Sequence, residues 1–140
     1  GGFTEFVPLP FVHFEAPAFR NGVTRKGPTL RESILLHAAA RLTLGAAGLT
    51  NIQASWVKMG PEFCGVLLNA GCNDVGGTLM NESITRAAGA KFGQEMGPRE
   101  LRRIIENEKG RTPKMRTTLY KPAGTERERT AVTAAPLREV

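Results

Sequence analysis

The sequence predicts an α/β fold made of three strand–helix units, of the kind that builds a parallel (β/α) barrel. Gly-Pro occurs three times, at residues 27–28, 60–61 and 97–98, at intervals of 33 residues (27 to 60) and 37 residues (60 to 97). Each pair precedes a segment with helical periodicity, and each helical segment follows a strand-like one. Units of about 35 residues in this alternation are typical of a (β/α)₈ barrel.

Each Gly-Pro pair is expected to begin a helix, because proline is well tolerated in a first helical turn. Thr29 and Glu32 have the spacing of a capping box. The expected apolar face of this first helix is Leu30, Ile34, Ala38 and Leu42, with Gly45 at its end. The second helix is expected to begin at Pro61 and to end at Gly71, with an apolar stripe of Phe63, Val66, Leu67 and Ala70. The third is expected to run from Pro98 to Gly110, with Leu101, Ile104 and Ile105 on one face.

The strands are expected near residues 4–9, 52–57 and 73–79, paired in parallel. Three strands do not close a barrel, and the chain opens on a strand-like segment without an initiator Met. We therefore expect residues 1–120 to be the carboxyl-terminal portion of a larger barrel enzyme. Residues 121–140 are poor in large apolar side chains and are expected to form a disordered tail or linker. A stand-alone three-stranded α/β domain is the alternative.

Composition excludes several classes of protein. Of 140 residues, 41% are hydrophobic and 23% charged, as in soluble globular proteins. No apolar run reaches the roughly 18 residues of a membrane span, and no secretory signal opens the chain. Two cysteines fit a reducing cytoplasm, where both are expected to be packing residues. The net charge of +6 is not accompanied by aromatics interleaved with the cations, so no nucleic-acid partner is expected.

Candidate site residues lie where each strand is expected to end, because active sites of such barrels are built there. Alternation along residues 51–56 places Gln53 and Ser55 on one face of a strand that should be buried on both sides. Polar side chains there predict a wet pocket. We expect the pocket to be lined by Gln53, Ser55, Asn73, Asp74, Thr78, Asn81 and Glu82. No catalytic triad, phosphate-binding loop, zinc pair or dinucleotide fingerprint is present, so catalytic and metal-ligating residues are predicted to be absent from this chain.

Four segments resemble the end of the FO synthase family of radical S-adenosylmethionine enzymes, which act in deazaflavin coenzyme biosynthesis. They are residues 4–11 (TEFVPLPF), 51–58 (NIQASWVK), 71–84 (GCNDVGGTLMNESI), and 111–113 (RTP) with 116–120 (RTTLY). The resemblance covers about residues 1–120. It is strongest to the tyrosine-using half, 5-amino-6-(D-ribitylamino)uracil–L-tyrosine 4-hydroxyphenyl transferase.

The resemblance implies that the three units are the last ones of a radical-SAM-type barrel. It also implies a [4Fe-4S] cluster and S-adenosylmethionine as cofactors of the parent enzyme, and L-tyrosine and 5-amino-6-(D-ribitylamino)uracil as substrates. The family's Cys-x-x-x-Cys-x-x-Cys pattern does not occur here, since the only cysteines are Cys64 and Cys72. The chain alone is therefore expected to be inactive, and to form the substrate-facing wall within the rest of the barrel. The alternatives are a menaquinone enzyme of the futalosine route and a non-catalytic accessory domain that pairs with a cluster-bearing chain.

Overall fold

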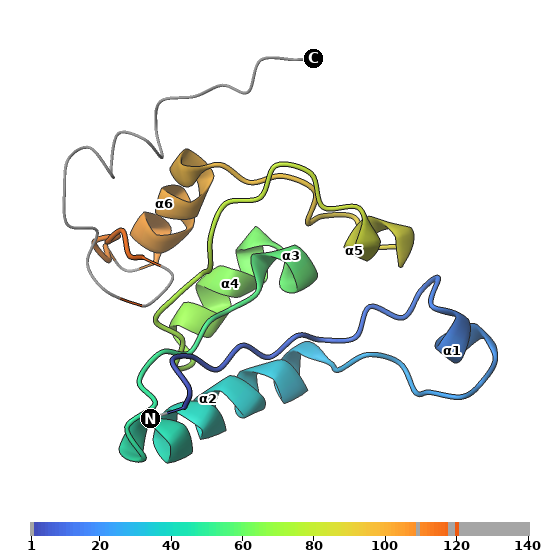
Figure 1. The fold of residues 1–140 in the computed structure, drawn as a ribbon, viewed down its shortest axis with the longest axis horizontal. Helices are drawn as coiled ribbons and strands as arrows, with labels where there is room; N and C mark the ends of the chain where they lie inside the picture. Colours follow the sequence, from blue (N-terminus) through green and yellow to red (C-terminus); the bar gives the residue numbers. More distant parts are fainter. Residues whose placement is uncertain (1, 109, 118–119, 121–140) are drawn as a thin grey trace.

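The computed structural model describes residues 2–108, 110–117 and 120 of the chain. The helices of this part, in chain order, are α1 (Pro17–Arg20), α2 (Leu30–Ala46), α3 (Trp56–Met59), α4 (Pro61–Leu68), α5 (Ile84–Ala87) and α6 (Pro98–Asn107). Figure 1 shows α2 alongside the amino-terminal segment, α3 and α4 in the middle of the molecule, and α5 at the end of a long excursion. None of the helices in the described residues is long and apolar enough to cross a bilayer.

Three extended segments meet in parallel at the centre of the molecule. Phe6 pairs with Ile52, and Gln53 pairs with Asp74, so the middle segment lies between the other two. The backbone N–H of Gln53 donates to the Phe6 carbonyl at 3.0 Å, and that of Ala54 donates to the Asp74 carbonyl at 2.9 Å. The predicted parallel order is confirmed. The pairings are isolated bridges rather than long strands, which gives a mixed, mostly helical α/β arrangement.

The expected second strand is shorter than residues 52–57 because the backbone turns into α3 at Trp56. The expected third strand, residues 73–79, also ends early. Gly76 has a φ of +80°, which turns the chain out of the extended conformation. Each turn follows directly after the paired residues of its segment. Because the segments are parallel, the loops that follow them begin at the same edge of the paired segments.

Helix α2 begins as the sequence predicts. The Thr29 hydroxyl accepts from the Glu32 N–H at 3.2 Å, and the Glu32 carboxylate accepts from the Thr29 N–H at 2.7 Å. The expected apolar face was only partly right: Ile34 packs against the core, but Leu30 and Leu42 are 39% and 76% exposed. The residues of α2 that are buried are Ser33, His37 and Ala40, and the helix continues past Gly45 to Ala46. Apolar side chains occur on nearly all sides of α2, so its sequence does not show which side of the helix faces the core.

Helices α4 and α6 begin at the predicted prolines, Pro61 and Pro98. They end earlier than the expected glycines, at Leu68 and Asn107. The expected stripe of α4 was also only partly right: Leu67 is buried, but Phe63 and Val66 are exposed. The other buried residues of this helix are Cys64, Gly65 and Leu68. The apolar face of α6 is confirmed, with Leu101 buried and Ile104 and Ile105 packed against the core.

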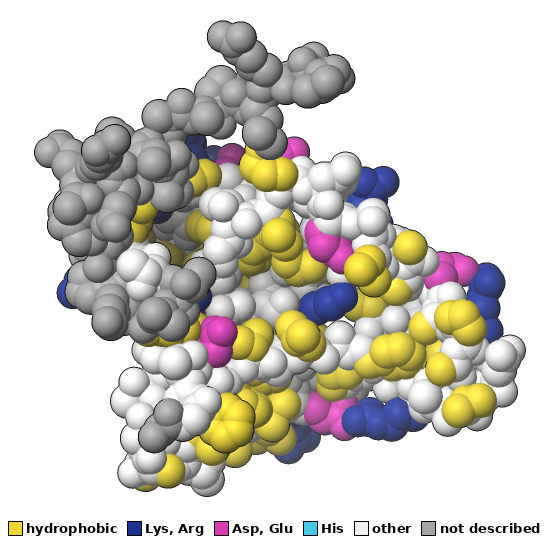
Figure 2. Space-filling model, in the orientation of Figure 1, with side chains coloured by type: hydrophobic (Ala, Val, Ile, Leu, Met, Phe, Trp, Pro, Cys, Tyr) yellow, Lys and Arg dark blue, Asp and Glu magenta, His cyan; other side chains and the backbone are white. Residues whose placement is uncertain are grey.

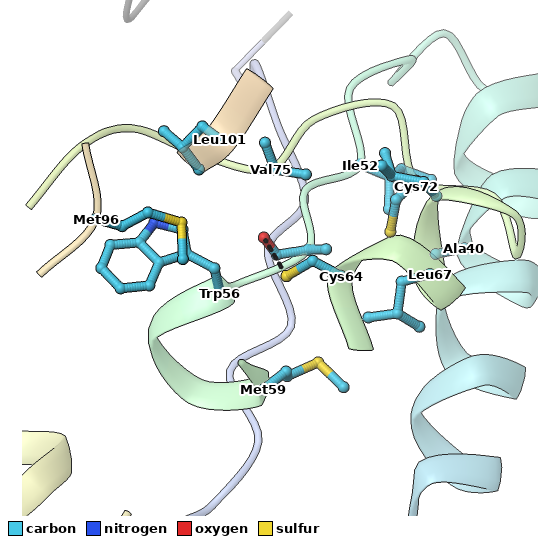
Figure 3. Close-up of a cluster of buried hydrophobic side chains, with 12 residues drawn as sticks. Ala40, Ile52, Trp56, Met59, Cys64, Leu67, Cys72, Val75, Met96 and Leu101 are labelled. Carbon is cyan, nitrogen blue, oxygen red and sulfur yellow. Dashed lines mark hydrogen bonds between the residues drawn. The ribbon is translucent and has the colours of Figure 1, made fainter. Parts of the chain in front are cut away.

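The core lies between the paired segments and the helices (Figure 3). Ile52 and Ala54 are fully buried and meet Cys64 and Leu67 of α4 on this side. The Cys64 thiol lies 3.9 Å from the Ala54 carbonyl. Both cysteines are free and buried, which confirms that they are packing residues. Because Ile52 and Ala54 point into the core, Gln53 between them faces the opposite side.

A long excursion leaves the core after Gly76 and returns at Gly97, as Figure 1 shows. Its two limbs are joined by an antiparallel bridge between Leu79 and Met96, and by the Glu82 N–H donating to the Gln94 carbonyl at 2.9 Å. We call residues 78–96 the arm; it carries α5. The tail expected over residues 121–140 lies outside the described residues.

Candidate functional site

The polar face of the paired segments carries Gln53 and Asp74 side by side. Their backbones form a parallel bridge, so both side chains leave the sheet on the same side, away from Ile52 and Ala54. The Asp74 side chain is only 11% exposed. A carboxylate held this far from water requires hydrogen-bond donors or a cation close to it.

Gly76 supplies one of these donors. Its N–H donates to the Asp74 carboxylate at 2.6 Å, a local turn that a short acidic side chain favours. The φ of +80° at Gly76 favours glycine. A Cβ atom at this position would also lie 2.9 Å from the Gln53 amide nitrogen. The glycine therefore permits both the turn and the close approach of the Gln53 side chain.

Arg116 supplies the cation. Its Nη2 donates to Asp74 Oδ1 at 2.8 Å, while its Nε donates to the other carboxylate oxygen. A third bond runs from Nη2 to the Gln53 Oε1 at 3.3 Å. Hydrogen bonding to Asp74 raises the pKa of Arg116 above its usual value. The segment after α6 is thus fastened to two of the three paired segments by one guanidinium.

Tyr120 completes this group. The Arg116 guanidinium carbon lies 4.0 Å from the centre of the Tyr120 ring, a cation–π contact. The phenol donates to the Glu5 carboxylate and lies 3.5 Å from the Gln53 Oε1. Burial, followed by the hydrogen bond to Glu5, raises the pKa of Tyr120 well above its usual range. We call Glu5, Gln53, Asp74, Arg116 and Tyr120 the strand-end cluster.

A pocket of about 250 Å³ opens beside Gln53 and is lined by both polar and apolar residues: Gln53, Ser55, Trp56, Val57, Gly76, Gly77, Thr78 and Leu79. We call it the polar pocket, after the side chains that could bind a ligand by hydrogen bonds. Three of the predicted site residues line it, namely Gln53, Ser55 and Thr78. Its far wall is the backbone of Gly76 and Gly77, held in place because the buried Trp56 indole donates to the Gly77 carbonyl at 2.9 Å. The pocket thus offers a carboxamide and two hydroxyls, groups that suit a ligand with many hydroxyl and amide groups.

A family model described as CofH/MqnC C-terminal region matches residues 1–128. The chain belongs to this family. It is 53% identical over 122 residues to the 5-amino-6-(D-ribitylamino)uracil–L-tyrosine 4-hydroxyphenyl transferase of Methanopyrus kandleri, covering 87% of this chain and 32% of the relative. It is 48% identical over 131 residues to the FO synthase of Streptomyces coelicolor, covering 94% of this chain and 15% of the relative. The chain therefore spans a third or less of these curated relatives. No solved structure matches it.

Asn73 does not line the polar pocket, although the sequence predicted that it would. Its side-chain oxygen accepts from the Ile52 N–H and from Arg41 Nη2, both at 2.9 Å. Arg41 also donates to the carbonyls of Gly71, at 2.7 Å, and Thr50, at 2.6 Å. Alternation along the strand turns Asn73 away from the side that Asp74 faces. Its carboxamide fastens α2 to the start of the third segment.

Asn81 and Glu82 lie on the arm rather than at the polar pocket. Asn81 is exposed. Glu82 accepts with both carboxylate oxygens from the Thr85 N–H, at 3.0 Å each, and so holds the start of α5. Desolvation raises the pKa of Glu82, but the hydrogen bonds from Thr85 and the charge of Lys58 outweigh it, so the net pKa is lowered.

Three members of the strand-end cluster escape sequence reasoning, namely Glu5, Arg116 and Tyr120. Arg116 lies 42 residues from Asp74, and Tyr120 lies 115 residues from Glu5, so no local pattern connects them. The one sequence signal for Arg116 and Tyr120 is the family resemblance of residues 116–120 (RTTLY). Their side-chain pattern alone predicts only a short extended segment.

The described residues do not provide a metal centre. Among residues 2–108, 110–117 and 120, no group of three or more His, Cys, Asp or Glu side chains is placed to hold a metal ion. Burial raises the pKa of both Cys64 and Cys72 to about 12. Buried neutral thiols do not suit an iron–sulfur cluster, whose ligands are thiolates.

Proposed function

We propose that the chain forms the carboxyl-terminal, substrate-facing wall of an FO synthase-type enzyme. Such an enzyme transfers the 4-hydroxybenzyl group of L-tyrosine to 5-amino-6-(D-ribitylamino)uracil. Besides membership of the family, one observation carries the proposal. Gln53 in the middle paired segment, Ser55 just after it and Thr78 on the arm line the polar pocket, and Gln53 contacts the Asp74–Arg116 ion pair.

The finer part of the fold belongs to this proposal: the three units are the last of a radical-SAM-type (β/α) barrel. Two features support it. The three segments pair in parallel in chain order, as consecutive barrel strands do. Leu35 and Leu42 of α2 are 58% and 76% exposed, and helices of neighbouring units would cover such side chains in a barrel.

The polar pocket suits the ribitylaminouracil substrate. A ribityl chain and a pyrimidine present hydroxyl, amine and carbonyl groups, which require partners when they leave water. Gln53 offers its amide N–H groups as donors, since its oxygen already accepts from Arg116, and Ser55 and Thr78 offer hydroxyls. Asp74 belongs to the same face, and its ion pair with Arg116 holds Gln53 in position through the 3.3 Å bond.

The radical chemistry is assigned to other parts of the enzyme. The family resemblance implies a [4Fe-4S] cluster with S-adenosylmethionine, and the described residues do not fit the cluster. The chain alone is therefore inactive in this proposal. Two free thiols fit an enzyme that works in the reducing cytoplasm.

Product analysis of the complete enzyme tests the proposal. With L-tyrosine, 5-amino-6-(D-ribitylamino)uracil and S-adenosylmethionine, we expect a conjugate of the 4-hydroxybenzyl group with the ribitylaminouracil, detected by mass spectrometry. If these substrates stay unchanged while a futalosine-route substrate is consumed, the menaquinone alternative replaces the proposal. If activity requires a second, cluster-bearing chain, the accessory-domain alternative replaces it.

Variants of the pocket test the role of its residues. Gln53→Ala, Ser55→Ala and Asp74→Ala should each raise KM for the ribitylaminouracil or lower turnover by about tenfold, the effect of losing one hydrogen bond of ordinary strength. The absorbance of the iron–sulfur cluster should be retained. Thr43→Ala, which removes an exposed hydroxyl from α2, is the matched control and should leave kinetics unchanged. Unchanged kinetics in all three pocket variants would refute the assignment.

A further inference from the structure

A second hollow lies on the other side of α3, between the amino-terminal segment and α5. Its volume is about 540 Å³. Most of its lining is apolar, including Leu9, Pro10, Phe11, Ile84 and Ala87. Figure 2 shows hydrophobic side chains gathered along this amino-terminal segment, towards α5. We call this hollow the apolar cleft.

The walls of the apolar cleft are fastened to each other. The Glu15 N–H donates to the Ala88 carbonyl at 3.0 Å, which joins the amino-terminal segment to the end of α5. Gly89, which has a φ of +92°, packs so closely that a Cβ atom there would lie 2.8 Å from the Phe14 Cβ. The cleft is therefore a built feature of two distant segments, not a gap between loose chains.

Lys58 is the cation of the cleft. Its ammonium donates to the Thr85 hydroxyl at 2.5 Å, and Thr85 is fully buried. Thr85 is in turn held by Glu82 through its backbone N–H, as described above. These contacts place a half-buried ammonium at a fixed point in a mostly apolar hollow.

Among the described residues, Lys58 has no carboxylate in direct contact. The acidic residue in the lining is Glu15, and its carboxylate already pairs with Arg20 at 2.6 Å. Glu82 is near enough for the charge of Lys58 to lower its pKa, but its oxygens accept from the Thr85 N–H and the two side chains form no direct ion pair. In the part of the chain that the structure describes, no carboxylate lies within ion-pair distance of Lys58. An anionic group on an otherwise apolar ligand would complement this arrangement.

We infer that the apolar cleft is the binding site for the aromatic amino acid substrate, with the Lys58 ammonium holding its carboxylate and the apolar lining holding its ring. This inference rests on the proposed function and divides it between two hollows. The polar pocket takes the ribitylaminouracil, and the cleft takes L-tyrosine. The two hollows are adjacent, since Val57 lines the polar pocket and Lys58, the next residue of α3, lines the cleft.

A two-by-two comparison of ligand and variant tests the role of Lys58 in the complete enzyme. L-tyrosine and L-tyrosinamide share a ring and an amine, but only L-tyrosine has a carboxylate. Equilibrium dialysis with radiolabelled L-tyrosine, and competition by L-tyrosinamide, give the two Kd values. In the wild type, L-tyrosine should bind at least tenfold more tightly than the amide. In Lys58→Met, this preference should fall to within twofold. Lys26→Met removes an exposed lysine outside the cleft and should keep the wild-type preference.

The outcomes separate this inference from the proposed function. If Lys58→Met keeps a tenfold preference for L-tyrosine, the carboxylate is held elsewhere and the inference is wrong. The same follows if both ligands lose affinity equally, because Lys58 would then only support the shape of the cleft. If the wild-type enzyme binds no L-tyrosine, the proposed function itself fails.

Discussion

The guanidinium of Arg116 and the carboxylate of Asp74 form a two-point ion pair across 42 residues of sequence. Their side chains are 26% and 11% exposed, so the pair is largely removed from water. The contact fastens the segment after α6 onto the polar face of the paired segments. It also orders Gln53, the residue that the strand-end cluster shares with the polar pocket.

Replacing Arg116 by Met should destabilise the protein by about 2 kcal/mol, because it leaves the Asp74 carboxylate largely buried without its cation. Arg116→Lys keeps the charge but loses the two-point geometry, and should have an intermediate effect. Urea unfolding of the complete protein measures both. The matched control is Arg20→Met, which breaks an exposed ion pair with Glu15 and should cost less than about 0.5 kcal/mol. Equal losses in the Arg116→Met and Arg20→Met variants would contradict this account.

Gly76→Ala should reduce both stability and affinity for the ribitylaminouracil. The φ of +80° imposes a cost of about 1–2 kcal/mol on an L-residue. The new methyl group would also displace the Gln53 amide, which lies 2.9 Å from the Cβ position. Gly48→Ala is the control, because Gly48 also has a positive φ, +93°, but nothing lies within 4 Å of a Cβ there and it does not line the polar pocket. Both variants should lose stability, but KM should rise only in Gly76→Ala, and a similar rise in both would mean that KM follows stability alone.

Asn73 should be important for folding rather than for substrate binding. Asn73→Ala removes the acceptor shared by Arg41 and the Ile52 N–H, at a cost of about 1–3 kcal/mol. Because the side chain does not line the polar pocket, KM should stay within twofold of the wild type. Urea unfolding and steady-state kinetics of the same variant separate the two roles. A large rise in KM with unchanged stability would restore Asn73 to the set of substrate-binding residues.

The features that sequence reasoning recovered are those fixed within a few residues. Thr29 and Glu32 form their capping box, and Pro61 and Pro98 begin their helices, because the signals act over one helical turn. The buried face of a helix was predicted poorly where apolar residues occur on all its sides. Leu42 and His37 are both on α2, yet the leucine is exposed and the histidine is buried, since neighbouring elements decide which side is covered.

The site could be predicted only in part for the same reason. Alternation correctly placed Gln53 opposite Ile52 and Ala54, because the period of a strand is local. The partners of Gln53 could not be found in this way. Arg116 and Tyr120 reach it only because the chain after α6 returns to the strand ends, and Lys58 gains its role from Thr85 on the arm. Only the tertiary structure brings these residues together.

The two cysteines should make the protein sensitive to alkali. Burial raises the pKa of both thiols from 9.0 to about 12. In the unfolded chain the thiols lose their protons near pH 9, whereas the folded chain keeps them, so the stability they contribute is complete below pH 9 and falls as the pH rises towards 12. Urea unfolding between pH 8 and pH 11 should therefore show a steeper loss for the wild type than for a Cys64→Ala, Cys72→Ala double variant. All other groups are common to both proteins, so the difference between the two curves isolates the thiols.

The rate at which the same two thiols are alkylated gives an independent measurement of their burial. At pH 8.5, iodoacetamide should leave Cys64 and Cys72 unmodified in the folded protein and should label both in urea, because the reactive species is the thiolate. Peptide mass spectrometry locates the label and distinguishes these two positions from any other cysteine in the complete enzyme. Rapid labelling of Cys64 without denaturant would mean that α4 opens away from Ala54, and that the core of Figure 3 is not maintained in solution.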